Sequence, residues 1–479
     1  MLLEQIGYFC EYEINIFINI FFDKNEDGII KTIFSHENDK IKVDTEIDFN
    51  GKKYKGYYEQ EFSSYETDKK LIKKIYSTSV TKSFVSAAKK IRNIELPWGV
   101  MSGIRPAKSV RQLKNEGKND EQIKKILKDI YDLSPEKSDL AIKVAENESK
   151  ILKKIKENSV SLYIGIPFCP SRCLYCSFVS TDIKVSGKYM DEFCDKLVIE
   201  IKKTGKILKE LGFFVQNIYI GGGTPTTLSL ENLEKIYKAI DKYIKKTENR
   251  EFTLEAGRPD TITKEKMELS KKYGVNRVSI NPQTLNEKTL KIIGRKHTKE
   301  MFYDAFKIAK DVGFNCINTD LIAGLPGESF EDFKKSLDDI VKLNPENITV
   351  HSMCVKRAAR LNFSDYELTD YSEMNKMLCY TKEEMEKTGR EPYYMYRQKN
   401  ISGNLENVGY SYPEYMSSYN INIMEEAQTI IALGGGGASK IVLGDKIERV
   451  VNFKEPYEYI KRFDEILEKK EEIADYFRK

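Results

Sequence analysis

From Ser161 onward, short runs of β-branched residues alternate with longer stretches that have the apolar spacing of amphipathic helices. This alternation predicts repeated βα units, which build a parallel sheet covered by helices. The predicted strands cover residues 161–166, 217–220, 251–256, 276–281, 315–321 and 347–352. Six units fit a partial barrel better than a closed barrel of eight. We therefore predict an α/β fold, a partial (β/α)6 barrel, with its chemistry at the carboxyl ends of the strands.

The segments before the barrel have a different pattern. Alternating segments at Glu11 to Phe22 and Ile41 to Phe49, with a turn at Asn50-Gly51, predict a small β unit. Residues 68–157 then have helical spacing, with Lys and Glu on the solvent faces. Together these segments predict an α+β extension over residues 1–157.

The segments after the barrel are less regular. The βα pattern ends near residue 355, and a helix is predicted over residues 371–387 before Tyr- and Gly-rich segments. This irregular residue pattern favours a separate domain that covers the substrate. We accordingly expect three domains: the α+β extension (1–157), the barrel (158–355) and a C-terminal substrate-covering domain (356–479).

Composition limits the class of protein. Of the 479 residues, 40% are hydrophobic and 32% are charged, as in soluble globular proteins, and no window approaches the ~20 apolar residues of a membrane span. The longest apolar run, Ile14 to Phe22, is interrupted by two asparagines and is interpreted as a strand. Acidic residues near the start of the chain argue against a signal peptide, so we expect a cytoplasmic protein. The 78 Lys and Arg and 74 Asp and Glu alternate along the helices, which argues against a nucleic-acid partner.

Three of the eight cysteines are close together in the sequence. Cytoplasmic cysteines are expected to be reduced, so a tight group indicates metal binding or catalysis. Cys169, Cys173 and Cys176 follow the first barrel strand, and Pro167 and Pro170 place them on a loop. Three thiolates at these spacings can hold a cubane [4Fe-4S] cluster and leave one iron open for the amino and carboxylate groups of a methionine moiety.

A zinc site or three structural thiols is the alternative interpretation. Zinc sites usually combine paired C-x-x-C units with a fourth Cys or His, and the three histidines, His36, His297 and His351, lie far away in the sequence. The unpaired set of three therefore favours the cluster. The other cysteines are expected to be structural: Cys10, Cys194, Cys316, Cys354 and Cys379.

Several residues at the predicted strand ends suit a cofactor. Gly221-Gly222-Gly223-Thr224-Pro225 lets the backbone approach a ligand closely, although such a turn alone is a weak signal. The Glu255 carboxylate can bind an ammonium group, and the planar guanidinium of Arg295 can bind a carboxylate with two hydrogen bonds. The Asp320 carboxylate can accept hydrogen bonds from ribose hydroxyls. For any one of these three side chains, a salt bridge to another of them is an equally good interpretation.

The C-x-x-x-C-x-x-C spacing is the hallmark of the radical S-adenosylmethionine (SAM) superfamily, and further motifs narrow the resemblance. They are Tyr163-Ile-Gly-Ile-Pro-Phe-Cys169, Gly221-Gly-Gly-Thr-Pro-Thr226, Glu255-Ala-Gly-Arg-Pro-Asp260, Ile280-Asn-Pro-Gln283-Thr-Leu, Ile293-Gly-Arg295-Lys-His297 and Thr319-Asp320-Leu-Ile-Ala-Gly-Leu-Pro-Gly327. Over residues 160–440 the set resembles the oxygen-independent coproporphyrinogen III oxidases. With the long N-terminal extension it most resembles their HemZ-type branch.

This resemblance implies a [4Fe-4S] cluster ligated by Cys169, Cys173 and Cys176, and SAM as the second cofactor. The residues that match a first SAM site are Tyr163, Gly222, Glu255, Cys354 and Ala438, and those that match a second are Tyr175, Gly223, Thr224, Gln283, Arg295 and Asp320. It also implies a tetrapyrrole substrate and a low-potential electron donor such as flavodoxin or ferredoxin.

The implied reaction is decarboxylation of two propionates of coproporphyrinogen III to vinyl groups through a 5′-deoxyadenosyl radical, which gives protoporphyrinogen IX. Lys356, Arg357 and Arg360 are a candidate clamp for the substrate carboxylates, although a solvated basic segment is an equally good interpretation. Tyrosines between residues 393 and 415 could line a flat macrocycle, but such a cluster is more often a β surface.

Two positions depart from the well-studied oxidases. Those enzymes have His where this chain has Gly165 and a further Cys where it has Phe178. A haem-binding chaperone derived from these oxidases is the rival function. Its His-Asn-x-x-Tyr-Trp motif is not matched by Gly403 to Tyr410, which lacks the His and the Trp. Another radical SAM enzyme acting on a tetrapyrrole is the third possibility.

Overall fold

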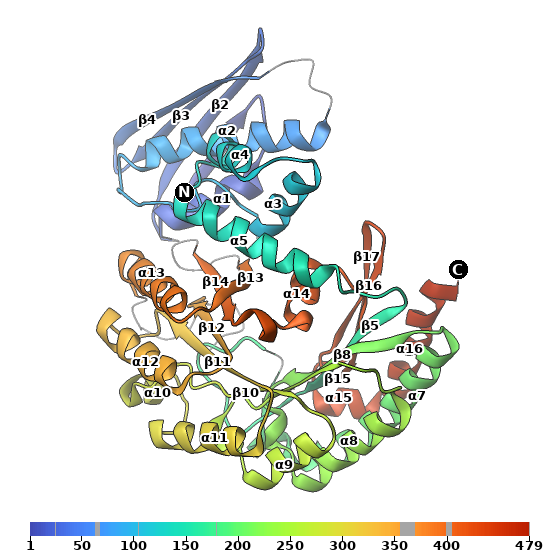
Figure 1. Cartoon of the computed structure of the whole chain (residues 1–479). Coiled ribbons are helices and arrows are strands. Elements are labelled where there is room, and N and C mark those ends of the chain that lie inside the picture. Colours follow the sequence, from blue (N-terminus) through green and yellow to red (C-terminus); the bar gives the residue numbers. More distant parts are fainter. Residues whose placement is uncertain are drawn as a thin grey trace. The chain divides into compact units, whose positions relative to one another are not determined.

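A computed structural model describes residues 1–478 with the exception of residues 24, 63–67, 104, 179, 355–368 and 399–404. The chain divides into two compact units (Figure 1). The first comprises residues 1–145 and 396–406, and the second comprises residues 146–395 and 407–479. The three domains expected from the sequence, with boundaries near residues 157 and 355, stay a prediction.

The first unit contains a four-stranded sheet of β1 (Leu2–Ile6), β2 (Gly28–Glu37), β3 (Lys40–Phe49) and β4 (Lys52–Glu61), in that order. Strand β1 is parallel to β2, and the other neighbours are antiparallel. Asn50 and Gly51 join β3 to β4 with φ angles of 53° and 73°, as a two-residue hairpin turn requires. The strand and the turn predicted here are confirmed.

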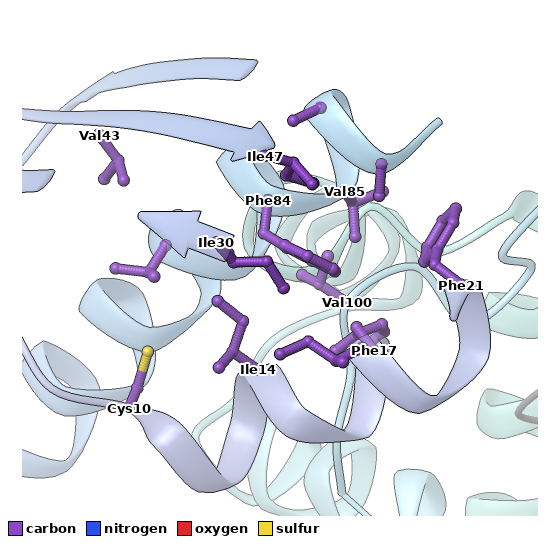
Figure 2. Packing of buried hydrophobic residues seen from close by; sticks show 14 of the residues in the cluster. Cys10, Ile14, Phe17, Phe21, Ile30, Val43, Ile47, Phe84, Val85 and Val100 are labelled. Carbon is purple, nitrogen blue, oxygen red and sulfur yellow. The ribbon is translucent and has the colours of Figure 1, made fainter. Parts of the chain in front are cut away.

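The segment Glu11 to Phe22 is not a strand, and that prediction was wrong. It forms helix α1 (Glu11–Phe21), which connects the parallel strands β1 and β2. Ile14, Phe17 and Phe21 are fully buried, and this spacing of three and four residues is helical. Figure 2 shows these side chains packed with Ile30 of the sheet.

Four further helices follow in the N-terminal part: α2 (Lys69–Ala88), α3 (Pro106–Asn115), α4 (Asp120–Tyr131) and α5 (Pro135–Leu152). They confirm the helical pattern predicted for residues 68–157. Helix α2 packs Phe84 and Val85 into the core that α1 shares with the sheet (Figure 2). Within this unit, Glu406 accepts hydrogen bonds from Trp98 Nε1 at 2.6 Å and from Lys137 Nζ at 2.5 Å, which fixes one end of the 396–406 segment.

The described part of the second unit is organised on an 11-stranded sheet. Its order is β13-β14-β12-β11-β10-β9-β8-β5-β15-β16-β17. The strands are β5 (Ser159–Ile166), β8 (Phe214–Gly222), β9 (Glu251–Glu255), β10 (Arg277–Ser279), β11 (Cys316–Ala323), β12 (Asn347–Ser352), β13 (Glu391–Arg397), β14 (Glu406–Ser411), β15 (Ile430–Gly434), β16 (Ala438–Leu443) and β17 (Lys446–Val451).

The six predicted barrel strands are confirmed as β5 and β8 to β12, which are parallel neighbours in that order. Together with their helices they form the expected α/β partial barrel, with flanking parts. Strand β15 extends the parallel sheet beyond β5, with Gly434 opposite Gly165. Strands β6 (Phe168–Cys169) and β7 (Thr181–Asp182) form a separate two-stranded pair.

Helices lie along the outer side of this sheet (Figure 1). Those of the second unit after α5 are α6 (Ile183–Ser186), α7 (Met190–Glu210), α8 (Leu230–Tyr243), α9 (Lys264–Lys272), α10 (Glu287–Ile292), α11 (Lys299–Val312), α12 (Phe330–Leu343), α13 (Tyr371–Lys387), α14 (Ser418–Glu425), α15 (Pro456–Lys461) and α16 (Phe463–Arg478). The helix predicted over residues 371–387 is therefore confirmed. Across the described residues, none of the helices combines the length and apolarity that crossing a membrane demands.

Candidate cofactor site

The cysteine loop, which we define as residues 169–176, begins immediately after β5 and Pro167. Cys169 lies in β6 and pairs with Asp182 of β7. The side chains of Cys169 and Cys173 are buried and that of Cys176 is half-buried, and all three are free thiols. The three sulfur atoms are close enough to influence one another electrostatically. The structure therefore brings the three predicted cysteines together at the carboxyl end of β5.

Arg258 holds this loop from one side, and the sequence analysis gave this residue no role. Its guanidinium donates to the carbonyl and hydroxyl oxygens of Ser171 at 3.2 and 3.1 Å and to Cys173 Sγ at 3.8 Å. Asp260 accepts from Nε and Nη2 of the same guanidinium at 3.0 Å each. The side chain of Arg258 is almost fully buried, so a fixed cation lies beside the thiols.

These thiols form a donor set that suits an iron–sulfur cluster. Burial raises the pKa of Cys169, and it raises the pKa of Cys176 to about 11, so both carry a proton in the absence of metal and would lose it on metal binding. Within the residues that the structure describes, no three His, Cys, Asp or Glu side chains converge as the ligands of one metal ion do. A cubane cluster takes each thiolate on a different iron, so its ligands need not converge on one point.

The glycine turn at the end of β8 lies against the cysteine loop. The backbone N–H groups of Gly223 and Thr224 donate to the carbonyls of Ile166 and Phe168 at 2.7 and 2.8 Å. Thr224 Oγ1 lies 3.5 Å from Cys169 Sγ. A Cβ atom at Gly223 would come within 2.6 Å of the Phe168 carbonyl oxygen, so only glycine permits this close approach.

Glu255 ends β9 beside this turn. A Cβ atom at Gly221 would lie 2.5 Å from Glu255 Oε2, which shows how closely the carboxylate packs on the turn. Burial raises the pKa of Glu255 to about 8, and the Asp320 carboxylate adds to this rise, although a hydrogen bond from the Gly222 backbone lowers it. A cationic ligand group would relieve the repulsion between the two carboxylates.

Gln283 follows the end of β10, and Arg295 follows helix α10. Arg295 is buried and donates through Nη1 to the Asn281 carbonyl and through Nη2 to the Gly257 carbonyl, the second at 3.1 Å. Its guanidinium is also an electrostatic neighbour of the Tyr175 phenol. Gln283 has a φ of 69°, which is unusual outside glycine, and bridges to Leu321 of β11. Among the described residues its Oε1 atom has no hydrogen-bond partner, so it is available to a ligand.

Asp320 belongs to a polar network that the sequence analysis did not identify. Asn318 Nδ2 donates to Asp320 Oδ1 at 2.7 Å, and the Asp320 backbone N–H donates to Asn281 Oδ1 at 3.2 Å. His351 Nε2 of β12 lies 3.7 Å from Asp320 Oδ2. Asn318 and Asp320 are two residues apart on β11, so their side chains face the same side of the sheet. The parallel register of β11 and β12, which sets His351 opposite Ile322, brings His351 to that side as well.

A column of aromatic rings continues the site. Tyr163 of β5 stacks on Tyr219 with ring centroids 6.2 Å apart, and Tyr219 stacks on Tyr419 of α14 at 4.7 Å. Burial raises the pKa of all three phenols far above pH 7, so they stay neutral. Tyr163 also lies near Gly222, because a Cβ atom there would be 3.4 Å from its hydroxyl oxygen.

Gly165 is enclosed by backbone from β15. A Cβ atom at this position would lie 2.7 Å from the Gly435 carbonyl oxygen, and Gly435 N–H donates to the Gly165 carbonyl at 3.0 Å. Buried Glu200 accepts from Gly434 N–H at 2.8 Å and pairs with buried Lys470 at 2.9 Å. The glycine at position 165 is thus required by the way β15 packs on β5.

The remaining predicted residues are placed as follows. Cys354 follows β12 with a half-buried side chain, and Ala438 opens β16 opposite Val451 with an exposed side chain. Phe178 is 67% exposed next to the cysteine loop. The candidate clamp Lys356, Arg357 and Arg360 lies outside the described residues. Of the tyrosines considered for a macrocycle, Tyr393 is fully buried and accepts from Asn347 and Asn420, so it is part of the core.

The chain is similar to known proteins over the region that contains this site. The family model described as Radical SAM superfamily matches residues 163–340. A Bacillus subtilis protein described as oxygen-independent coproporphyrinogen-III oxidase-like protein HemZ is 39% identical over 456 residues, which cover 93% of this chain and 89% of the relative. The heme chaperone HemW of the same organism is 35% identical over 199 residues, 41% of this chain and 51% of the relative.

Among solved structures, the coproporphyrinogen III oxidase HemN from Escherichia coli has the same fold. Its TM-score is 0.54 at 22% identity, with 67% of this chain and 72% of that chain covered. The fold and the site together define a protein of the radical SAM class, whose cofactors are a [4Fe-4S] cluster and SAM. Within that class, the chain belongs to the family of HemZ-type oxygen-independent coproporphyrinogen-III oxidase-like proteins.

Proposed function

We propose that the protein converts coproporphyrinogen III to protoporphyrinogen IX without oxygen, by oxidative decarboxylation of two propionate side chains. One observation carries the proposal: three free thiols and a glycine turn lie together at the carboxyl ends of neighbouring parallel strands. Arg258, which is buried, and Glu255, whose pKa is raised, lie in the same place. The relationship to HemZ over nearly the whole chain supports it.

The residues proposed for the cofactors follow from the same grouping. Cys169, Cys173 and Cys176 would ligate the cluster. Tyr163, Gly222, Glu255, Cys354 and Ala438 would line a first SAM, and Tyr175, Gly223, Thr224, Gln283, Arg295 and Asp320 would line a second. Gly222, Glu255 and Asp320 lie close together in the structure, whereas Cys354 and Ala438 rest on the sequence resemblance alone.

Each group of residues has a task in this proposal. When bound, the reduced cluster and SAM would supply the radical chemistry that takes a hydrogen atom from a propionate. Loss of carbon dioxide and one electron would then convert that side chain to a vinyl group. Glu255 would take the SAM ammonium, and Asp320, held by Asn318 and His351, would orient ribose hydroxyls. The neutral tyrosine column would exclude water from one side of the site.

The substrate and the reductant are proposed by chemical class. The substrate is a tetrapyrrole with propionate side chains, and the electron source is a low-potential carrier such as flavodoxin or ferredoxin. The relationship to a coproporphyrinogen-III oxidase-like protein supports the substrate class, and the electron source is proposed because the cluster has to be reduced.

A haem chaperone is the second candidate, and the similarity to HemW favours it. Gly165 is consistent with either function, because the packing of Gly435 leaves no room for a side chain at that position. The absence of the His and the Trp of the haem motif in the sequence of residues 403–410 favours the oxidase.

Anaerobic turnover separates the two functions. We expect reconstituted protein with SAM, a reductant and coproporphyrinogen III to form protoporphyrinogen IX with about two 5′-deoxyadenosine and two methionine per product. Slow release of 5′-deoxyadenosine without a decarboxylated porphyrin, together with tight haem binding, would instead establish the chaperone.

A further inference from the structure

The surface around the cysteine loop has a charge balance unlike that of the whole chain. Residues 158–190 and 288–299 contain eight Lys and Arg and a single acidic residue, Asp182, whereas the chain as a whole has 78 basic and 74 acidic residues. These segments therefore carry an excess of positive charge next to the three thiols, with exposed Glu287 at the start of α10 as a neighbouring acidic residue.

Five of these basic residues are exposed lysines. Lys184, Lys188, Lys288, Lys291 and Lys296 are all exposed, and in the described parts of the chain none of them forms an ion pair. Lysines on the neighbouring helices differ, as shown by the pairs Lys235 with Asp195, Lys307 with Asp311 and Lys334 with Asp338. The unpaired lysines keep their full charge available to a partner.

Both segments contact the cysteine loop directly. Thr181 N–H donates to the Pro167 carbonyl at 2.9 Å, so the chain that leads to Lys184 runs beside Cys169. On the other side, Leu174 N–H donates to the Ile293 carbonyl at 3.0 Å, and Ser171 Oγ donates to the Gly294 carbonyl at 3.3 Å. The two groups of lysines therefore flank the loop.

Two exposed apolar side chains lie in the segment that continues from the cysteine loop to these lysines. Phe178 is 67% exposed two residues after the half-buried Cys176, and Val185 is 73% exposed next to Lys184. Exposed aromatic and aliphatic side chains with a charged rim are typical of protein interaction surfaces. A small surface of this kind suits a brief encounter such as electron transfer.

From these observations we infer that Phe178, Val185 and the lysines around them form the docking surface for a small acidic electron-carrier protein. The inference rests on the proposed function, because it requires a reducible cluster at Cys169, Cys173 and Cys176. In the step itself, one electron leaves the anionic hydroquinone of a flavin carrier, which becomes the neutral semiquinone, and the oxidised cluster gains that electron. No proton or group moves, so the carrier needs only to come close to the buried thiols and not to enter the substrate site.

The test compares a protein reductant with a small one. Stopped-flow absorbance would follow cluster reduction by flavodoxin hydroquinone and by titanium(III) citrate in wild type and in the Lys184→Glu/Lys188→Glu/Lys288→Glu/Lys291→Glu variant. We expect the second-order rate with flavodoxin to fall by about tenfold or more at low salt, and the difference to vanish near 1 M salt, where the Debye length is about 3 Å. The rate with titanium(III) citrate should change by less than about twofold.

A control variant reverses the charge of two exposed lysines at the opposite ends of the strands, Lys245 and Lys272, which precede β9 and β10. Lys245→Glu/Lys272→Glu should leave the flavodoxin rate within about twofold of wild type. Carbodiimide cross-linking of oxidised flavodoxin to the reconstituted protein gives an independent readout, with cross-links expected at Lys184, Lys188, Lys288 or Lys291.

Each outcome decides one claim. An equal loss of rate in the control variant, an unchanged rate in the fourfold variant, or cross-links confined to other lysines would overturn the docking surface. Failure of the proposed cluster would look different, because wild type would then show no absorbance change even with titanium(III) citrate.

Discussion

At the scale of single residues, the site depends on side chains whose charge is set by their surroundings. Glu255 is the clearest example. Burial and the nearby Asp320 raise its pKa to about 8, whereas a glutamate in an unfolded chain has a pKa near 4.3. The folded protein thus holds a proton on this carboxyl over a pH range in which the unfolded chain has lost it.

This difference predicts a pH dependence of stability without SAM. The contribution of Glu255 is fully present below about pH 4 and is lost as pH rises toward 8, because the unfolded state then releases a proton that the folded state keeps. Glu255→Gln should remove this pH-dependent contribution. Between pH 5.5 and 7.5, the free energy of unfolding should therefore fall more in the wild type than in the variant, by a difference on the order of 1 kcal/mol. Urea unfolding measures it, with the exposed Glu268→Gln as control. Parallel pH curves for wild type and Glu255→Gln would show that this carboxyl is ionised in the folded protein.

Arg258 is a positioning residue at the same scale, since it touches the loop and not the substrate. Arg258→Gln should remove a cation next to Cys173, which makes the cluster harder to reduce and lowers its midpoint potential. Arg258→Lys keeps the charge but loses the fork to Asp260, so its potential should lie between the two while iron is lost faster to a chelator. EPR-monitored redox titration and chelator kinetics measure these effects. A purely structural role would change the rate of iron loss and leave the potential of both variants at the wild-type value.

The residues that ligate and surround the cofactors differ in how far sequence could predict them. The cysteines and the glycine turn carry their role in their spacing. The sequence motif that contains Arg258 gave no indication of its role, because its hydrogen bonds to Ser171 and Asp260 exist only after folding. His351 was missed for the same reason, since the parallel register of β11 and β12 sets it beside Asp320. Asn318 was missed because its bond to Asp320, two residues later on β11, follows from the extended strand.

At the scale of elements, strand β15 determines which residue fits at position 165, near the end of β5. Its glycine-rich end is tied to Glu200, which accepts from Gly434 N–H and Asn452 Nδ2 and pairs with Lys470. Lys470 in turn donates to the Ala432 carbonyl at 2.7 Å. A fully buried ion pair thus holds the strand that packs on Gly165.

Breaking this pair should be costly. Lys470→Met leaves the Glu200 carboxylate buried without its cation, and we expect a loss of about 3–5 kcal/mol in the free energy of unfolding. Replacing both residues with Met should recover much of that loss, because no uncompensated charge remains. Urea or thermal unfolding measures both, with exposed Lys461→Met as the control. A loss below about 1 kcal/mol in the single variant would mean that water reaches Glu200.

The elements of the barrel were predictable because each strand is a short β-branched run followed by an amphipathic helix. Helix α1 was not, because Ile14 to Phe21 fits both an alternating and a helical pattern. Burial of Ile14, Phe17 and Phe21 favours the helix, and the parallel pairing of β1 with β2 requires a connection of that kind. The addition of β15 to the parallel sheet was also missed, since its partner β5 lies more than 260 residues earlier in the chain.

At the scale of the whole molecule, relationship to HemZ covers nearly the entire chain, whereas the radical SAM model covers only residues 163–340. The second unit contains every residue proposed for cofactor binding, and the first unit has its own core of α1, α2 and a four-stranded sheet. The family and the cofactors follow from these relationships. The ligands and the reaction are claims about particular side chains, and they require direct measurement.

Anaerobic reconstitution with iron and sulfide tests the central claim, that three thiolates hold a cluster with one iron open to SAM. The account predicts about four iron and four sulfide per chain, and a change in the EPR spectrum of the reduced cluster when SAM is added. Cys169→Ala, Cys173→Ala and Cys176→Ala should each abolish the cluster, whereas Cys379→Ala, which changes an exposed cysteine of α13, should keep it. Stoichiometric zinc without iron–sulfur absorption, or an EPR spectrum that SAM leaves unchanged, would contradict the account.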